Sequence, residues 1–293
     1  MNENKIKVLF DTDIGSDIDD ALALAYLLRE ENCDLLGITT VTGEPVKRAM
    51  LASALCTAAG RPDIPVIPGV EKPLYGEVRQ NVNTQANVLE RLEHKKDFPD
   101  ISAVEFMRKV IRENPGEVTL LAVGPLTNVA LLFALDREIP SMLKSLVLMC
   151  GDFKSEKSEW NAKLDSFATA VVYSSDLKKT VSYGFDVTST FCIGHDETVA
   201  RFNGGLADTA KEFATEYLSK PTRRLFFHDP LAAVGLFHPE VCTYRKGDIS
   251  VRADGSDESG NTDFTENENG IHLVADTVDI EKFYKIYFET ITK

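Results

Sequence analysis

Near its N-terminus the chain carries five aspartates within ten residues, Asp11, Asp13, Asp17, Asp19 and Asp20, with no basic residue between them. Carboxylates that a fold brings this close repel each other and raise each other's pKa values. The start of a helix accounts for Asp17 or Asp19, because acidic side chains cap helix N-termini and interact favourably with the dipole. It does not account for Asp11 and Asp13, which we expect to flank the turn at the end of a strand. A hard cation such as Ca²⁺, which binds about six to eight oxygen ligands, would neutralise the cluster.

The remaining ligands of such a cation must come from elsewhere in the chain. An EF-hand loop is excluded, because Leu22 is the twelfth residue counted from Asp11 and that position requires a glutamate. Ligands of α/β sheets bind at the carboxyl ends of the strands, so segments that follow strands or begin helices are the candidates. Three such segments are VGPLTN (123–128), SEWNAKLDS (158–166) and HDP (228–230).

Each of these segments offers oxygen ligands, although each alone also has an ordinary structural explanation. A turn at Thr127 would leave carbonyl groups unpaired, yet Thr127 could simply cap a helix. Glu159 and Asn161 are two residues apart, so in an extended segment both side chains would point the same way. Asp229 precedes a proline that suits the first turn of a helix, so Asp229 could be a helix cap. Only the combination with the aspartates indicates a site.

The elements that position these residues follow from the alternation of short apolar runs with amphipathic runs. We expect strands at residues 7–10, 35–41, 65–67, 118–123, 145–149 and 180–187. We expect helices at residues 19–29, 46–59, 101–112, 126–135, 165–173 and 279–291. Continuous apolar strands between helices are typical of a parallel sheet covered on both faces. The sequence therefore predicts a single α/β domain over residues 1–293, with an open, doubly wound, mostly parallel sheet and helices on both faces.

Composition and charge exclude several classes of protein. The chain has 293 residues, of which 43% are hydrophobic and 27% charged, as in ordinary globular proteins. Its net charge of -14 argues against nucleic acid as a partner, because phosphate binding needs a basic surface. The N-terminal residues lack the pattern of a signal peptide, and no apolar run predicts a membrane span. Five scattered cysteines without a CxxC pair predict reduced thiols in a cytoplasmic protein.

The order of these motifs carries a resemblance. DTDIGSDIDD, TTVTGE, GPLTN, an apolar strand ending in Met149, EWN and HDP follow one another from Lys7 to about Phe237. In this order they resemble the inosine-uridine preferring nucleoside hydrolase family. The resemblance implies parallel strands with Ca²⁺ at their carboxyl edge and hydrolysis of the N-glycosidic bond of ribonucleosides to ribose and free base. It also implies a homodimer or homotetramer.

The resemblance further implies a role for each matching residue. The metal ligands would be Asp13, Asp20, the carbonyl of Thr127 and Asp229. The ribose would contact Asp19, Asp229, Glu159 and Asn161, with Met149 as the apolar floor beneath it. Asp13 would also be the general base, and His228 would lie beside the leaving base. The chemistry is consistent, because N-ribosyl cleavage develops positive charge on the ribose and carboxylates stabilise it. Asp13 can take a proton from a water bound to Ca²⁺, and His228 is the nearest candidate to protonate the base.

The chain departs from the family signature at several positions. Ile14 replaces a proline, two residues are inserted before the aspartate pair, which leaves Asp17 extra, and Glu44 replaces an asparagine. Beyond the matching motifs, residues 254–269 are acidic and turn-rich, and we expect a loop there between late strands. The polar segment 74–96 lacks the His-Gly and Asp-Gly pairs that the family often uses to recognise the base. Base recognition is therefore expected from Gln80, Asn83 or Gln85, and from Tyr217, Arg223 and Arg224 of a second segment, 217–227.

Three alternatives to this function stay open in the sequence. The first is hydrolysis of a different N-riboside. The second is a phosphatase of the haloacid dehalogenase type, although Gly15 stands where that family places a threonine or valine after its first aspartate. The third is a ribose-binding protein without catalysis, against which the retention of Asp13 and His228 argues.

Overall fold

The computed structural model describes residues 5–155, 157–218 and 223–293. Its centre is a nine-stranded sheet. In spatial order the strands are β10 (Thr262–Glu266), β9 (Cys242–Val251), β11 (His272–Val278), β6 (Thr180–Tyr183), β5 (Ser145–Met149), β4 (Val118–Ala122), β1 (Ile6–Thr12), β2 (Cys33–Thr40) and β3 (Val66–Ile67). In this sheet β9 is antiparallel to both its neighbours, β10 and β11, and the other strands all run in one direction. The strand order reverses direction around β1, and this arrangement is the predicted doubly wound α/β fold.

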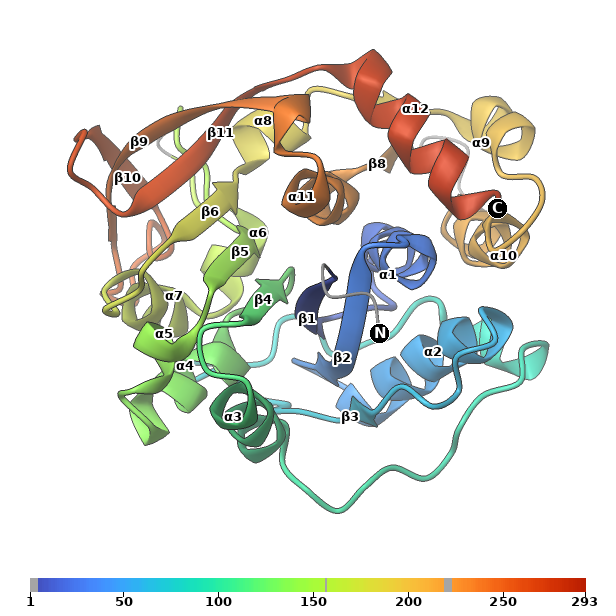
Figure 1. The fold of residues 1–293 in the computed structure, drawn as a ribbon, viewed down its shortest axis with the longest axis horizontal. Coiled ribbons are helices and arrows are strands. Elements are labelled where there is room, and N and C mark those ends of the chain that lie inside the picture. Colours follow the sequence, from blue (N-terminus) through green and yellow to red (C-terminus); the bar gives the residue numbers. More distant parts are fainter. Residues whose placement is uncertain (1–4, 156, 219–222) are drawn as a thin grey trace.

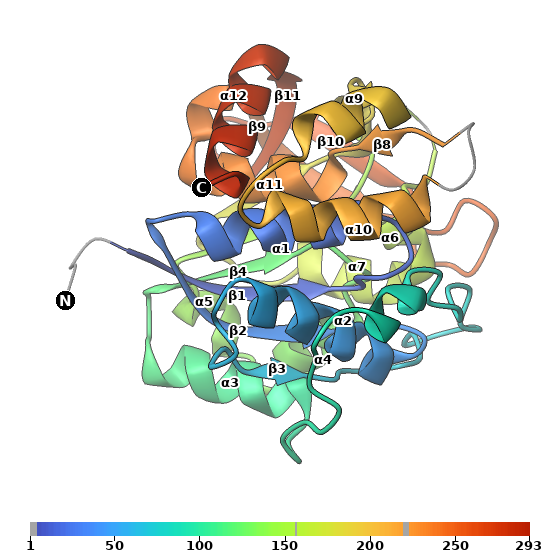
Figure 2. The ribbon, with the colours of Figure 1, turned by 90° about the vertical axis from the view of Figure 1, so that its right-hand side faces the viewer.

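Helices cover both faces of the sheet (Figure 1). On one face lie α1 (Asp19–Arg29), α2 (Pro45–Ala58), α10 (Ala207–Tyr217), α11 (His228–Phe237) and α12 (Ile280–Ile291). On the other face lie α3 (Ala103–Glu113), α4 (Thr127–Leu135), α5 (Ile139–Met142) and α7 (Ser166–Tyr173). Figure 2 shows α10 lying along α1. The central strand β1 serves both layers, because Val8 and Phe10 pack into the core beneath α1 while Leu9 packs into the core on the opposite face.

Shorter elements complete the described part of the chain. They are α6 (Trp160–Leu164), α8 (Phe185–Thr188), α9 (His195–Arg201), the two-stranded sheet of β7 (Cys192–Ile193) and β8 (Leu225–Phe226), and 3₁₀ turns at Ala86–Glu90 and Pro239–Val241. Among the described residues, no helix combines the length and the apolar character that crossing a membrane requires.

Three sequence predictions are corrected by the structure. The strand expected at residues 180–187 ends at Tyr183, because the chain turns at Gly184 and forms the short helix α8. The acidic segment 254–269 is not entirely a loop, since it contains the edge strand β10, whose backbone pairs with β9. Asp11 does not flank the turn, because β1 continues to Thr12 and Asp11 pairs with both β2 and β4.

Candidate active site

A tight turn connects β1 to α1 and sets the direction of the aspartates. Gly15 in this turn has a φ of 115°, and a Cβ there would overlap the side chain of Asn83. Only glycine adopts this conformation without strain and leaves room for the neighbouring chain. The turn directs Asp19 and Asp20 into the first turn of α1, where the positive end of the helix dipole favours carboxylates. Asp20 also accepts hydrogen bonds from the hydroxyl of Thr12 and, at 3.1 Å, from the backbone N–H of residue 13.

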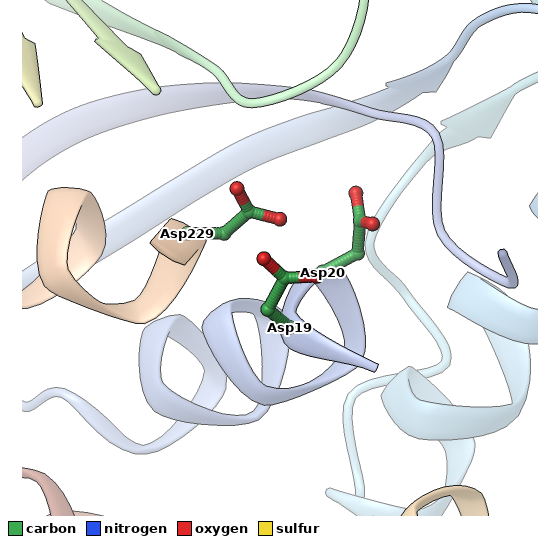
Figure 3. Close-up of side chains that lie close together, drawn as sticks. All are labelled: Asp19, Asp20 and Asp229. Atoms are coloured by element: carbon green, nitrogen blue, oxygen red, sulfur yellow. The ribbon is translucent and has the colours of Figure 1, made fainter. Parts of the chain in front are cut away.

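Three buried carboxylates meet at this point (Figure 3). Asp19 and Asp20 come from α1, and Asp229 comes from the first turn of α11, which packs against α1. One carboxylate oxygen from each lies within 4.8 Å of the others. The proline that follows Asp229 fits the first turn of α11, as the sequence predicts, so the helix start carries this carboxylate to the pair on α1.

The electrostatics of this group fit a cation. Burial raises the pKa of Asp20 well above its usual range, and the charges of Asp13 and Asp19 raise it further. Burial likewise raises the pKa of Asp229, with repulsion from Asp19 and Asp20 added to it. Ionised carboxylates cannot remain so close in a buried site without a compensating charge. Their geometry and their hard oxygen donors therefore suit a divalent cation.

Asp13 lies in the same site but outside this group of three. Its Oδ2 accepts a hydrogen bond from the amide of Gln80, and its backbone carbonyl accepts one from Arg48. Burial raises the pKa of Asp13, whereas the charge of Arg48 and the hydrogen bond from Gln80 oppose that rise. Gly124, in the GPLTN segment, makes room for the carboxylate, because a Cβ there would lie 2.7 Å from Oδ1 of Asp13.

A fully buried arginine, Arg48 of α2, supports the turn from behind. Its guanidinium donates to the backbone carbonyls of Gly43, Asp13, Ile14 and Gln80 and to the hydroxyl of Ser16. The sequence analysis missed this residue. A signal was present, because Arg48 is a charged residue in a stretch, 48–56, that is otherwise apolar or small. A buried charge in such a helix needs partners, and here the partners are the carbonyls of the aspartate turn.

The aspartates line a pocket of about 420 Å³. Its lining residues are Asp13, Ser16, Asp17, Asp19, Asp20, Gln80, Val123, Met149, Glu159, Trp160, Asn161, Phe185, Tyr217, Arg223, His228 and Asp229. Most residues that the sequence singled out are therefore brought together from segments far apart in the chain. Trp160 and Phe185 were not assigned a role from the sequence, although Trp160 is the aromatic residue of the EWN motif. A volume of this size is in the range of small-molecule sites.

Four residues to which the sequence analysis gave a binding role do not line the pocket. The hydroxyl of Thr127 donates to Asp165 at 2.7 Å, and the role expected of its carbonyl stays a prediction. Asn83 and Gln85 are buried behind the aspartate turn, where the amide of Gln85 donates to the carbonyl of Asp17. Arg224 is exposed outside the pocket. The amide of Gln85 therefore braces the turn, and the base-recognition role expected of Asn83 and Gln85 stays a prediction.

Glu159 and Asn161 of the EWN motif, which the resemblance assigns to the ribose, are arranged differently from the expectation. Residues 159–161 are not extended, because Glu159 is the N-cap of α6 and its carboxylate accepts the backbone N–H groups of Asn161 at 2.7 Å and Ala162 at 3.0 Å. The amide of Asn161 donates to the carbonyls of Val123 and Met149. Both side chains still line the pocket, because the cap and these bonds hold them at the carboxyl ends of β4 and β5.

His228 lies between two aromatic rings, stacked on Phe185 with ring centroids 5.6 Å apart and on Phe226 at 5.2 Å. Its Nδ1 shares a hydrogen bond of 2.7 Å with the hydroxyl of Thr188 on α8. Burial lowers the pKa of His228 to about 4, so the imidazole is neutral near pH 7. The sequence analysis expected His228 to protonate the leaving base, and a neutral imidazole cannot do so as an imidazolium acid near pH 7.

A second rim of the pocket is formed by Tyr217, Arg223 and Asp17. The hydroxyl of Tyr217 donates to Oδ2 of Asp17 at 3.3 Å, and the guanidinium of Arg223 lies over the Tyr217 ring, 4.5 Å from its centroid. Asp17 also accepts the N–H of Ile18, so it links the aspartate turn to this rim. Residues 219–222 of the predicted segment 217–227 lie outside the described residues.

A parallel sheet with a carboxylate-lined pocket at its strand ends is typical of a protein that acts on or binds a small molecule. Comparisons with known proteins identify the family. The sequence profile of the inosine-uridine preferring nucleoside hydrolases matches residues 8–285. Uridine nucleosidase 1 of Arabidopsis thaliana is 30% identical over 275 residues, which cover 85% of this chain and 79% of the plant protein. The pyrimidine-specific ribonucleoside hydrolase RihA of Citrobacter koseri is 32% identical over 277 residues, 88% of this chain and 87% of that protein.

The fold agrees with this result. The solved structure of the plant nucleoside hydrolase PpNRh1 superimposes with a TM-score of 0.85 at 25% identity, covering 98% of this chain and 99% of that chain. The chain belongs to the inosine-uridine preferring nucleoside hydrolase family and is an N-ribosyl hydrolase. This assignment excludes the phosphatase of the haloacid dehalogenase type that the sequence left open.

Proposed function

We propose that the protein hydrolyses the N-glycosidic bond of ribonucleosides in a Ca²⁺-dependent reaction that gives ribose and free base. The observation that carries this proposal is the buried group of Asp19, Asp20 and Asp229 in the same pocket as Asp13. Such a group needs a cation, and a pocket lined with carboxylates suits a substrate that becomes positively charged as its bond breaks.

Asp20 and Asp229 would hold the cation, with further carboxylate oxygens from Asp13 and Asp19 and the carbonyl of Thr127. Four carboxylates and a carbonyl are hard oxygen donors, which favours Ca²⁺ over softer metals. When bound, the ion orients a water molecule, increases its acidity and offsets the charge of the carboxylates.

Asp13 is the proposed general base. Gln80 occupies its Oδ2, so Oδ1 is the atom that would accept the proton of the attacking water. The carboxylates of Asp19 and Glu159 and the amide of Asn161 bind the ribose hydroxyls, and Met149 packs beneath the sugar. The carboxylates of Asp13, Asp19, Asp20 and Asp229 are buried, and burial strengthens their attraction for the cationic ribose of the transition state.

His228 assists departure of the base as a neutral hydrogen-bond donor. If the hydroxyl of Thr188 donates to Nδ1, the ring proton is on Nε2, which can then donate to the base. The stacking on Phe185 and Phe226 fixes the plane of the ring for that purpose. This role replaces the imidazolium acid that an ordinary pKa would have allowed.

Pyrimidine ribonucleosides, with uridine first, are the proposed substrates. The support comes from relatives at 30 to 32% identity whose names specify uridine or pyrimidine ribonucleosides. The rim of Tyr217 and Arg223 supplies an aromatic face and a cation that could contact the polar edge of a base. Gln80, from which base recognition was also expected, lines the pocket as well.

Release of ribose from uridine, cytidine, inosine, adenosine and guanosine, with and without a tight Ca²⁺ chelator, tests the proposal. We expect release from uridine to be fastest, to stop with the chelator and to return with added Ca²⁺. Asp13→Asn, which keeps the shape of the side chain, should still bind Ca²⁺, more weakly because one carboxylate ligand is lost, and should lose most turnover even at saturating Ca²⁺. Bound Ca²⁺ without release from any nucleoside would refute the activity and leave another N-riboside or a non-catalytic ribose-binding protein. A homodimer or homotetramer in the cytoplasm stays a prediction that size-exclusion chromatography and cell fractionation can test.

A further inference from the structure

One side chain connects the proposed general base to the aromatic wall of the pocket. Gln80 donates from its amide nitrogen to Oδ2 of Asp13 and accepts at its amide oxygen the indole N–H of Trp160, at 2.8 Å. All three residues line the pocket. We propose that Gln80 is a positioning residue that holds Asp13 and Trp160 together for the reaction. This inference rests on the proposed function of the same site.

The chemistry of the two partners fixes the orientation of the Gln80 amide. An indole N–H can only donate and an ionised carboxylate can only accept, so the amide oxygen must face Trp160 and the NH₂ group must face Asp13. Gln80 therefore supplies an N–H to a single oxygen of Asp13, Oδ2. The other oxygen, Oδ1, keeps its capacity to accept a proton.

The backbone of Gln80 is held rigidly enough for this role. Its carbonyl accepts from Arg48 at 3.3 Å, and the same guanidinium binds the carbonyl of Asp13, so one side chain fixes the backbones of two of the three residues in the Asp13–Gln80–Trp160 bridge. Gly43 allows the two segments to approach, because a Cβ there would lie 2.6 Å from the carbonyl oxygen of Gln80. The backbone N–H of Asn83, three residues after Gln80, donates to the carboxylate of Glu44 at 2.9 Å. Segment 80–83 is thus anchored to the turns that follow β1 and β2.

Trp160 depends on the bridge more than a core residue would. It is the first residue of α6 and remains 53% exposed, so packing alone holds its ring weakly. It follows Glu159, and a fixed indole would keep this end of the pocket closed beside the ribose-binding carboxylate. Trp160 is also the one tryptophan of the sequence, so its fluorescence reports on the bridge without interference.

The test compares wild type with Gln80→Met, which keeps the length of the side chain and removes both hydrogen bonds, and with Trp160→Phe. Val82→Ala is the matched control, because Val82 is an exposed residue of the same segment outside the pocket. We expect Gln80→Met to lower kcat roughly 10- to 100-fold, the effect of losing a hydrogen bond to a charged group, with KM changed much less. The fluorescence anisotropy of Trp160 should fall in metal-free Gln80→Met and stay at the wild-type value in Val82→Ala.

The double variant Gln80→Met with Trp160→Phe shows whether Gln80 couples Trp160 to Asp13 or whether its two hydrogen bonds act independently. If Gln80 couples the two residues, Trp160→Phe should lower kcat in the wild-type background and add little in the Gln80→Met background. Equal anisotropy in wild type and Gln80→Met, or a kcat equal to that of Val82→Ala, would overturn the inference. Absence of hydrolysis by wild type would instead refute the proposed function, and the anisotropy of the metal-free protein would still decide whether the bridge holds Trp160.

Discussion

Replacement of Arg48 by methionine should destabilise the metal-free protein more than any other single change at the site. The variant keeps the apolar length of the side chain but removes the donors to four backbone carbonyls and one hydroxyl. It also removes a positive charge that acts on Asp13 and Asp20, two of the buried carboxylates. Removing one partner from a buried charged group costs about 3–5 kcal/mol. For a chain of this length about 2 °C of melting temperature corresponds to 1 kcal/mol, so the expected fall is about 6–10 °C.

Thermal unfolding followed by circular dichroism, with a chelator and with saturating Ca²⁺, measures this effect. The deficit should be largest with the chelator and smaller with Ca²⁺, because a bound cation also offsets the carboxylate charge and stabilises the folded state. Arg48→Lys keeps the charge but lacks the planar set of donors, so its melting temperature should lie between those of wild type and Arg48→Met. A melting temperature of Arg48→Met within 1–2 °C of wild type in the chelator would refute the view that Arg48 holds the aspartate turn.

Three further predictions concern the reaction and its metal. Asp20→Asn should abolish the rise in melting temperature that Ca²⁺ causes in wild type, about 5 °C at a concentration of 100 times Kd, and an unchanged rise would show that the ion binds elsewhere. Gly124→Ala should lower kcat about 100-fold with little change in melting temperature, because the added Cβ would displace the carboxylate of Asp13, and kcat near wild type would contradict the assigned base. Thr188→Val should slow hydrolysis of uridine about 10-fold but not that of a riboside with a nitrophenolate leaving group, which needs no hydrogen bond from His228. Equal effects on the two substrates would show that Thr188 does not act through the leaving base.

The sequence predicted the central elements of the fold because their patterns are strong. β5 and α1 have the predicted bounds, since a continuous apolar run and an amphipathic run after an acidic turn are unambiguous signals. The elements that were missed are short or lie at an edge. α8 spans only Phe185–Thr188, and β10 is mostly polar because it is an edge strand with few core contacts.

The candidate site was also predicted only in part. Asp20 and Asp229 were expected to share a metal site because the order of the motifs resembles the family, and the structure brings their carboxylates together. The functions of Gln85 and Arg48 could not be derived, since each depends on a backbone carbonyl that a distant segment presents. The low pKa of His228 was equally hidden, because it results from burial between Phe185 and Phe226, which no spacing along the chain reveals.

The most direct test of the central claim is the release of ribose from uridine by chelator-treated enzyme, measured before and after addition of Ca²⁺. If the aspartates form a cation site that supports N-ribosyl hydrolysis, the treated enzyme is inactive and Ca²⁺ restores release in proportion to its occupancy of the site. Release that continues at the full rate with the chelator present, while calorimetry shows no bound ion, would contradict the account.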